Sequence, residues 1–148
     1  MNEHNLSNVR KGKWAETKVI AELLKENYDI YSSIADDKGI DLVVRLKHDQ
    51  YVDIQVKGST KESKKPEFFA FRWNKGSRKN YFFVFYSETK NTFWVIPTEY
   101  MTGKEGKEVY GVDRRGYCSV NFGIPKHRNM FKTFENNWKI ISTYLNKE

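Results

Sequence analysis

Apolar residues recur along this chain with two periods, and each period predicts one kind of element. Between residues 9 and 27 they recur every three or four positions, which is typical of an amphipathic helix. From residue 29 onward, alternation and aromatic-rich runs indicate strands. The predicted strands cover residues 29–35, 40–46, 51–57, 68–73, 81–86 and 92–96, a polar loop covers 58–67, a hairpin lies around 117–122, and a closing helix covers 131–145. The sum is a mixed α/β domain with a central β-sheet flanked by helices.

The predicted helix carries one acidic residue on its apolar side. Its apolar stripe consists of Ala15, Val19, Ile20, Leu23 and Leu24. At 100° per residue, Glu16 falls in the middle of that stripe. A carboxylate directed at the interior is costly unless it is paired or bound to a metal ion. The helix pattern leaves two interpretations open, a structural partner for a buried base or backbone amide and a functional acid.

The segments 40–46 and 51–57 predict a β-hairpin. The register that matches every apolar residue pairs Leu46 with Val52, and it leaves a three-residue loop at 48–50. One face of this hairpin is aliphatic and the other is polar. On the polar face Arg45 comes opposite Asp53, a cross-strand pair that we interpret as structural.

Three further polar residues converge at one end of the same hairpin. In the predicted register Asp41 lies opposite Lys57, with Gln55 beside them. Together with Glu16 they supply oxygen ligands and one ammonium group. Oxygen ligands suit Mg²⁺, which lowers the pKa of a bound water and stabilises charge on a phosphate. Because the lysine can position that water or stabilise the reacting phosphate, the set is chemically coherent as a phosphodiester hydrolysis site.

The order of these residues resembles the PD-(D/E)XK nuclease superfamily. The segments that carry the resemblance are Glu16, then 39–44 (GIDLVV), then 52–58 (VDIQVKG). The Gln-x-Lys motif is similar to the branch found in Mrr-like restriction nucleases and some intron-encoded homing endonucleases. The match spans about residues 12–58, with Ile in place of the common Pro before Asp41.

The resemblance implies a restriction-endonuclease-like fold and a metal-dependent endodeoxyribonuclease. By this resemblance Asp41 is the principal metal ligand, Gln55 the second ligand, Glu16 the helical acid and Lys57 the catalytic lysine. The main-chain carbonyl of Val56 also reaches the metal. The implied cofactor is Mg²⁺, with Mn²⁺ as a substitute, and the implied partner is DNA. A homodimer is compatible with cleavage of two strands, although no sequence feature establishes one.

The distribution of charge agrees with a polyanionic partner. The net charge of +7 is uneven, since residues 1–60 hold nine basic and ten acidic residues, against 17 and nine in the remainder. We expect the basic segment that follows the motif to bind the DNA backbone. Its predicted nucleic-acid-binding residues are Lys61, Lys64, Lys65, Arg72, Lys75, Arg78 and Lys79. A solvated surface would have the same composition, and charge alone does not decide between the two.

Length and composition limit the remaining possibilities. A chain of 148 residues with 39% apolar residues is the size of one domain, which we assign to 1–148. We expect no membrane partner, because no apolar run approaches the length of a membrane span. The single cysteine, Cys118, excludes an internal disulfide and favours a cytoplasmic location. Two other functions stay open: a catalytically inactive nucleic-acid-binding module of the same fold, and an interaction protein in which Glu16 simply pairs with Lys57.

Overall fold

The computed structural model describes residues 7–34, 39–47, 49–72, 78–101 and 117–146. Its elements, in chain order, are α1 (Asn8–Lys25), β1 (Asp29–Ser32), β2 (Leu42–Arg45), β3 (Tyr51–Ser59), β4 (Phe68–Arg72), β5 (Tyr81–Ser87), β6 (Thr92–Pro97), η1 (Thr98–Met101), β7 (Tyr117–Asn121), α3 (Pro125–Met130), η2 (Lys132–Phe134) and α4 (Ile140–Thr143). No helix in these ranges is long and apolar enough to cross a membrane.

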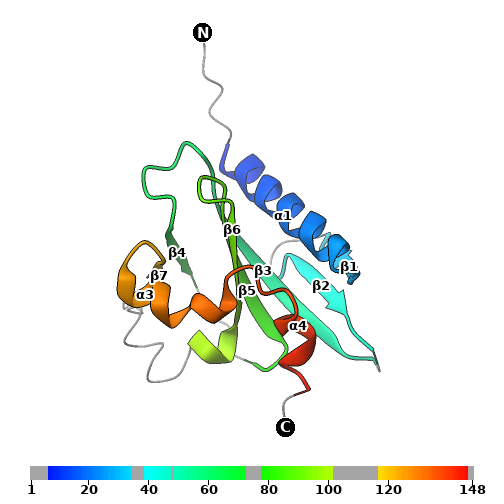
Figure 1. Ribbon diagram of the computed structural model, residues 1–148. Coiled ribbons are helices and arrows are strands. Elements are labelled where there is room, and N and C mark those ends of the chain that lie inside the picture. The colour runs from blue at the N-terminus through cyan, green and yellow to red at the C-terminus, as the bar shows by residue number, and fades with distance from the viewer. Residues whose placement is uncertain (1–6, 35–38, 48, 73–77, 102–116, 147–148) are drawn as a thin grey trace.

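A five-stranded mixed sheet forms the centre of the molecule (Figure 1). The strand order is β1-β2-β3-β5-β6, and β3 and β5 run parallel while the other neighbours run antiparallel. Every residue of β5 is buried. The reason is that layers cover both faces of the sheet at this strand, so its sequence, YFFVFYS, is apolar without alternation.

α1 and α4 cover one face of the central sheet. α1 contacts the sheet through a single row of buried residues four positions apart, Ala15, Val19 and Leu23. The predicted stripe was wider than this row. Leu24 is 61% exposed, because it lies about 100° around the helix from the last residue of the row.

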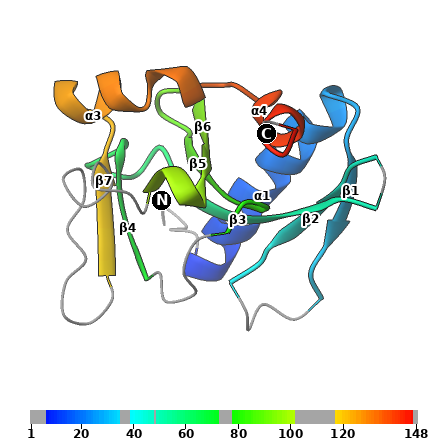
Figure 2. The same ribbon diagram turned by 90° about the horizontal axis from the view of Figure 1, so that it is seen from below.

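β4 and β7 form a second, two-stranded antiparallel sheet over the other face (Figure 2). An aromatic core joins the two sheets, with Phe122 stacked on Trp94 at a centroid distance of 4.1 Å. The predicted local hairpin around 117–122 is wrong. β7 pairs instead with β4, about 45 residues earlier, because this distant pairing buries Cys118 and Val120 against the core.

The hairpin of β2 and β3 forms in a register two residues away from the predicted one. Leu42 lies opposite Ile54, and Arg45 lies opposite Tyr51. The Leu46 N–H donates to the Gln50 carbonyl at 2.7 Å, which closes the turn. The cause lies in the turn, where Asp49 has a φ of +58°. The last position of a three-residue hairpin loop needs this left-handed conformation, and aspartate tolerates it well.

The predicted closing helix over 131–145 is interrupted. Only η2 and the short α4 are helical within it. Between them Asn136 adopts a φ of +48°, donates its N–H to the Phe93 carbonyl at 2.7 Å and accepts the Phe93 N–H with its side chain. The segment thus pairs with the edge of β6 instead of continuing as a helix.

Candidate active site

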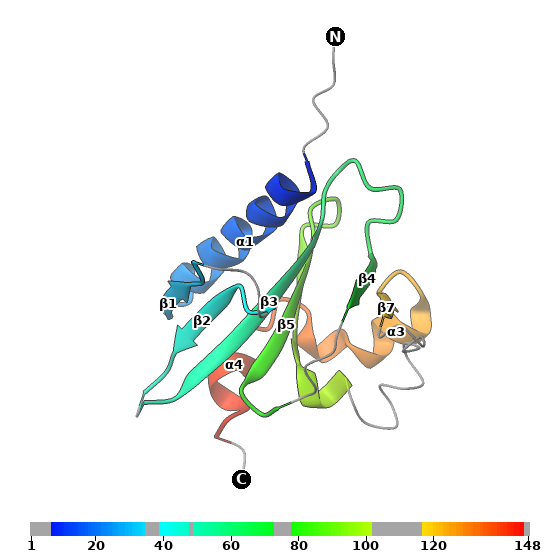
Figure 3. The ribbon, with the colours of Figure 1, turned by 180° about the vertical axis from the view of Figure 1, so that it is seen from behind.

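Glu16 lies on α1 where this helix touches the end of β3. The contact is tight, since a Cβ atom on Gly58 would lie 2.3 Å from the Cβ of Ala15. Figure 3 shows α1 and β3 converging here. The Glu16 side chain is 13% exposed, and its Oε2 lies 3.0 Å from Lys13 Nζ. Among the described residues, the cation paired with Glu16 is therefore Lys13 and not Lys57.

The Asp41 side chain, just before β2, accepts a hydrogen bond from a main-chain N–H of β3. Its Oδ2 accepts the Val56 N–H at 2.6 Å, and the residue is only 9% exposed. The Asp41 N–H in turn donates to the Ile54 carbonyl at 2.9 Å. A buried hydrogen bond to a charged acceptor contributes about 1.5–3 kcal/mol. The carboxylate is thereby held against the middle residue of the Gln-x-Lys motif.

The Gln55 side chain is held from two sides. The Tyr81 hydroxyl donates to Gln55 Oε1 at 2.8 Å, and the Gly39 carbonyl lies 3.2 Å from the same hydroxyl. Gly39 has a φ of +67°, and a Cβ atom there would contact the Gln55 amide at 3.5 Å. Tyr81 therefore connects the turn before Asp41 to the glutamine of the motif.

Tyr81 was not predicted from the sequence as a site residue. Burial raises the pKa of Tyr81 to about 12; the nearby Arg78 opposes the shift, while Asp41 and Asp53 add to it. The phenol is therefore neutral at physiological pH and donates a hydrogen bond. Only the parallel pairing of β3 with β5 brings Tyr81 beside the motif, so no local signal in the sequence could have identified it.

Lys57 lies on the same face of β3 as Gln55, which is the face away from α1. Val56, between them, points into the core under α1. Lys57 is half-buried and is followed by Gly58, which contacts the helix. The lysine thus lies between the Asp41–Val56 hydrogen bond and the contact of β3 with α1.

The structure brings the predicted catalytic residues to one end of the β2–β3 pair, but it joins only some of them by hydrogen bonds. Hydrogen bonds join Asp41 to the backbone of the motif and Tyr81 to Gln55. Glu16 approaches the same stretch of β3 from the opposite face of the sheet. The observed register also places Asp41 beside Gln55, where the predicted one placed it opposite Lys57.

Asp53 forms an ion pair, but not with the predicted partner. Arg78 pairs with Asp53 and lies over the Tyr81 ring, 5.1 Å from its centroid. Arg45 instead lies 3.8 Å from Asp49 in the hairpin turn. The two-residue difference in register explains the exchange, because it moves Arg45 opposite Tyr51.

The predicted DNA-binding residues follow the site along the chain. Lys61, Lys64 and Lys65 are exposed in the connection between β3 and β4. Arg72 ends β4, and Arg78 and Lys79 precede β5, all three exposed; Lys75 lies outside the described residues. The acids of this segment are paired, Glu62 with Lys11 and Glu67 with Lys90. Because both acids are paired with lysines from outside the segment, they do not neutralise its basic residues.

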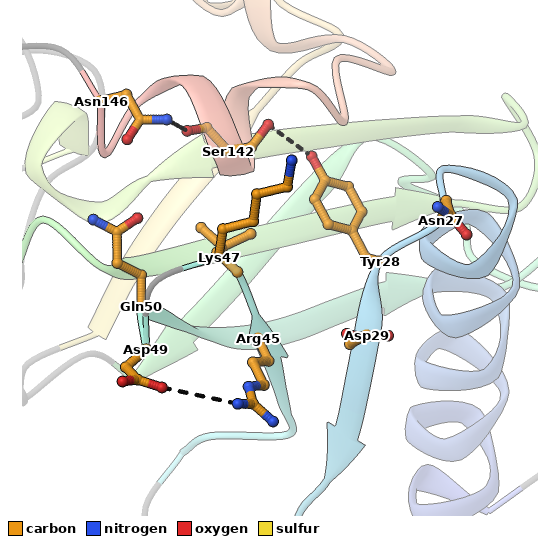
Figure 4. Close-up of a pocket in the computed structure, with 10 residues that line it drawn as sticks. Asn27, Tyr28, Asp29, Arg45, Lys47, Asp49, Gln50, Ser142 and Asn146 are labelled. Atoms are coloured by element: carbon orange, nitrogen blue, oxygen red, sulfur yellow. Dashed lines mark hydrogen bonds and ion pairs between the residues drawn. The ribbon is translucent and has the colours of Figure 1, made fainter.

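A pocket of about 840 Å³ lies at the other end of the hairpin (Figure 4). The turn after α1, the β2–β3 turn and the segment around α4 line it. The Tyr28 hydroxyl donates to the Trp138 carbonyl at 2.8 Å and lies 3.3 Å from Ser142 Oγ at its edge. None of the predicted catalytic residues contributes to this pocket.

The oxygen donors at the candidate site are of the kind that Mg²⁺ prefers. Asp41 offers a carboxylate and Gln55 an amide oxygen, both held by hydrogen bonds. In the described part of the chain, no three His, Cys, Asp or Glu side chains cluster as a metal site. Mg²⁺ does not need such a cluster, because it usually takes one or two carboxylates and keeps several waters. The donor set therefore fits this ion.

The architecture is a restriction-endonuclease-like α/β fold, as solved structures show. A bacterial homing endonuclease, I-Ssp6803I, superposes with a TM-score of 0.65 and 22% sequence identity over 95% of each chain. D212, a nuclease from a fusselovirus, superposes with a TM-score of 0.52 and 14% identity, covering 94% of this chain and 99% of that one. No family model and no curated protein matches the chain. The fold is thus shared with these two nuclease structures.

Proposed function

We propose that this protein is a Mg²⁺-dependent endonuclease that hydrolyses phosphodiester bonds in DNA, with Mn²⁺ as a substitute ion. The observation that supports the proposal best is the Asp41 carboxylate, bound to the backbone inside the Gln-x-Lys motif. Gln55 and Lys57 flank this point on one face of β3. The fold shared with two nuclease structures agrees with this function.

Asp41, Gln55 and the Val56 carbonyl are the residues that would hold the ion. Glu16 approaches from the other face of the sheet and would join them only by leaving its pair with Lys13. When bound, Mg²⁺ supplies positive charge to the phosphate and lowers the pKa of a bound water. Tyr81 acts on this set indirectly, because its neutral hydroxyl fixes the Gln55 amide oxygen. A held ligand loses less conformational freedom when it binds an ion than a mobile one does.

Lys57 is the proposed catalytic lysine. Its ammonium group donates hydrogen bonds to the reacting phosphate and stabilises the negative charge that builds up as the water attacks. Its half-buried position strengthens this interaction, since charges interact more strongly where water is partly excluded. The exposed lysines of the following segment, Lys61, Lys64, Lys65 and Lys79, bind the DNA backbone and position it without taking part in the chemistry.

The test is cleavage of supercoiled plasmid DNA by the Lys57→Ala variant. We expect loss of Mg²⁺-dependent nicking with nearly unchanged DNA affinity. Lys47→Ala is the matched control, because Lys47 is an exposed lysine in the turn of the same hairpin. Asp41→Asn should also abolish cleavage, since the amide can still accept the Val56 N–H but carries no charge. Unaltered cleavage by Lys57→Ala would overturn the assigned role.

Two observations favour a second function, DNA binding without cleavage. Glu16 is already paired with Lys13, and the motif carries Gln55 where a carboxylate would add a second charge. A protein of this kind would bind DNA with a strong dependence on salt. It would show no nicking and no thermal stabilisation by Mg²⁺, and these two measurements separate it from the nuclease.

A further inference from the structure

The two-stranded sheet of β4 and β7 has one buried and one exposed side. Its inner residues are buried in the aromatic core: Phe69, Phe71, Cys118 and Val120. Its outer residues alternate with these in both strands: Phe68, Ala70, Arg72, Tyr117, Ser119 and Asn121. The core fixes the position of the pair, and its outer side is exposed along β4 and half-buried at Ser119 and Asn121.

The outer side is built around a stacked arginine. Arg72 lies opposite Tyr117, and its guanidinium carbon is 5.1 Å from the centroid of that ring. None of the described carboxylates pairs with Arg72. Stacking on a ring limits the motion of the guanidinium group and leaves the N–H donors at its edge available to a partner. The guanidinium group is thus presented to a partner.

The middle of the surface is formed by small side chains, and its far end carries an aromatic ring with a lysine beside it. Ala70 pairs with Ser119 at the middle of the two strands, so no bulky side chain stands there. At the far end Lys65 Nζ lies 5.4 Å from the Phe68 ring centroid. The surface thus has a positive charge near each end and only short side chains between them. This combination suits a negatively charged partner that approaches the middle of the strands closely.

The surface and the candidate active site lie toward the same side of the molecule. In Figure 2 the end of β4 and the start of β7 extend toward the same side of the molecule as the start of β2, which Asp41 precedes. One DNA duplex can therefore meet both at once.

From this arrangement we infer that the β4–β7 pair enters the major groove of duplex DNA and that Arg72 reads a base there. This inference rests on the proposed function. The major groove is about 12 Å wide and admits a two-stranded ribbon, and arginine binds guanine O6 and N7 with two hydrogen bonds. The small Ala70 and Ser119 allow the base edges to approach the strands.

The test is selection from a pool of duplexes with a randomised centre, with Ca²⁺ in place of Mg²⁺ to prevent cleavage. We expect the full chain to enrich a motif. Arg72→Ala and Arg72→Lys should each lose preference at one or two adjacent base pairs by roughly 10- to 100-fold. Arg72→Lys should keep most of the overall affinity because it keeps the charge. Lys139→Ala is the control, since it removes an exposed charge next to α4, on the opposite layer.

Each other outcome has a defined meaning. Circular dichroism of the Arg72 variants verifies that this exposed position leaves the fold intact. If both variants enrich the motif of the unaltered chain, Arg72 does not read a base and the inference is wrong. If the unaltered chain binds all duplexes equally, base reading is overturned while the proposed nuclease stands. If it binds no duplex at all, the proposed function fails and the inference fails with it.

Discussion

Tyr81→Phe tests whether the buried hydroxyl positions a metal ligand. The variant removes the hydrogen bond to Gln55 Oε1 at 2.8 Å and the contact with the Gly39 carbonyl at 3.2 Å, and it leaves the packed ring in place. A neutral hydrogen bond contributes about 1 kcal/mol net, so the free energy of unfolding should fall by roughly that amount. For 148 residues this corresponds to a Tm lower by ~2–4 °C.

The functional effect of the same change should be larger than its effect on stability. Removing the partner that orients a metal ligand typically costs 10- to 100-fold in metal affinity or activity. We therefore expect the Mg²⁺ concentration for half-maximal plasmid nicking to rise by about that factor. The assay is a Mg²⁺ titration of nicking rate, run beside urea unfolding of the same protein.

Tyr28→Phe is the matched control. The Tyr28 hydroxyl also donates a 2.8 Å hydrogen bond, to the Trp138 carbonyl, but it lies by the pocket at the other end of the hairpin. It should lose similar stability with an unchanged Mg²⁺ requirement. If Tyr81→Phe behaves in the same way as Tyr28→Phe, the hydroxyl has only a structural role and the assignment of Gln55 as a held ligand is wrong.

Four further predictions concern the contact of α1 with β3, the charge on Glu16, the titration of Tyr81 and the basic segment. Gly58→Ala should lower the free energy of unfolding in urea by ~1–3 kcal/mol, because the new Cβ atom would lie 2.3 Å from the Cβ of Ala15. Gly12→Ala is the control and should not destabilise the protein, since no atom lies within 4 Å of its Cβ position. Glu16→Gln should remove activity but change the unfolding free energy by only ~0.5 kcal/mol, since its partner Lys13 is exposed; a loss of ~3 kcal/mol or more would reveal a buried charge that it compensates. The pKa of Tyr81 is raised from 10 in the unfolded chain to about 12, so its stabilising contribution is complete below pH 10 and is lost as the pH rises toward 12. The urea concentration at half-unfolding should therefore fall more steeply over this range for the wild-type protein than for Tyr81→Phe. Replacing Lys64 and Lys65 with Ala should flatten the slope of log K against log salt by up to ~0.9 per lost phosphate contact, and an unchanged slope would show that they do not bind the backbone.

The sequence alone was sufficient for the first helix, for most of the strands and for the faces of the β2–β3 hairpin, but not for the closing helix or for the pairing of β7. The alternation in 40–46 and 51–57 predicts both strands and the side on which each residue lies. A change of register by two residues leaves every side chain on its face, because the period of a strand is two. For this reason the polar set of Asp41, Gln55 and Lys57 could be recognised although the predicted register was wrong.

The partners of those residues depended on tertiary structure. The φ of +58° at Asp49 sets the turn, and the turn decides that Asp41 lies beside Gln55 and that Asp53 is left for Arg78. Both registers pair apolar residues with apolar residues, so apolar matching does not distinguish them, whereas the conformation of the turn does.

Contacts between segments distant in the chain were beyond the reach of the sequence pattern. Tyr81 contacts Gln55 only because β5 pairs in parallel with β3, although β4 lies between these two strands in the sequence. Arg72 meets Tyr117 only because β7 returns to β4. Both pairings are selected by the burial of apolar side chains from several elements at once. Such burial is a property of the assembled core, and the periodicity of a single segment carries no record of it.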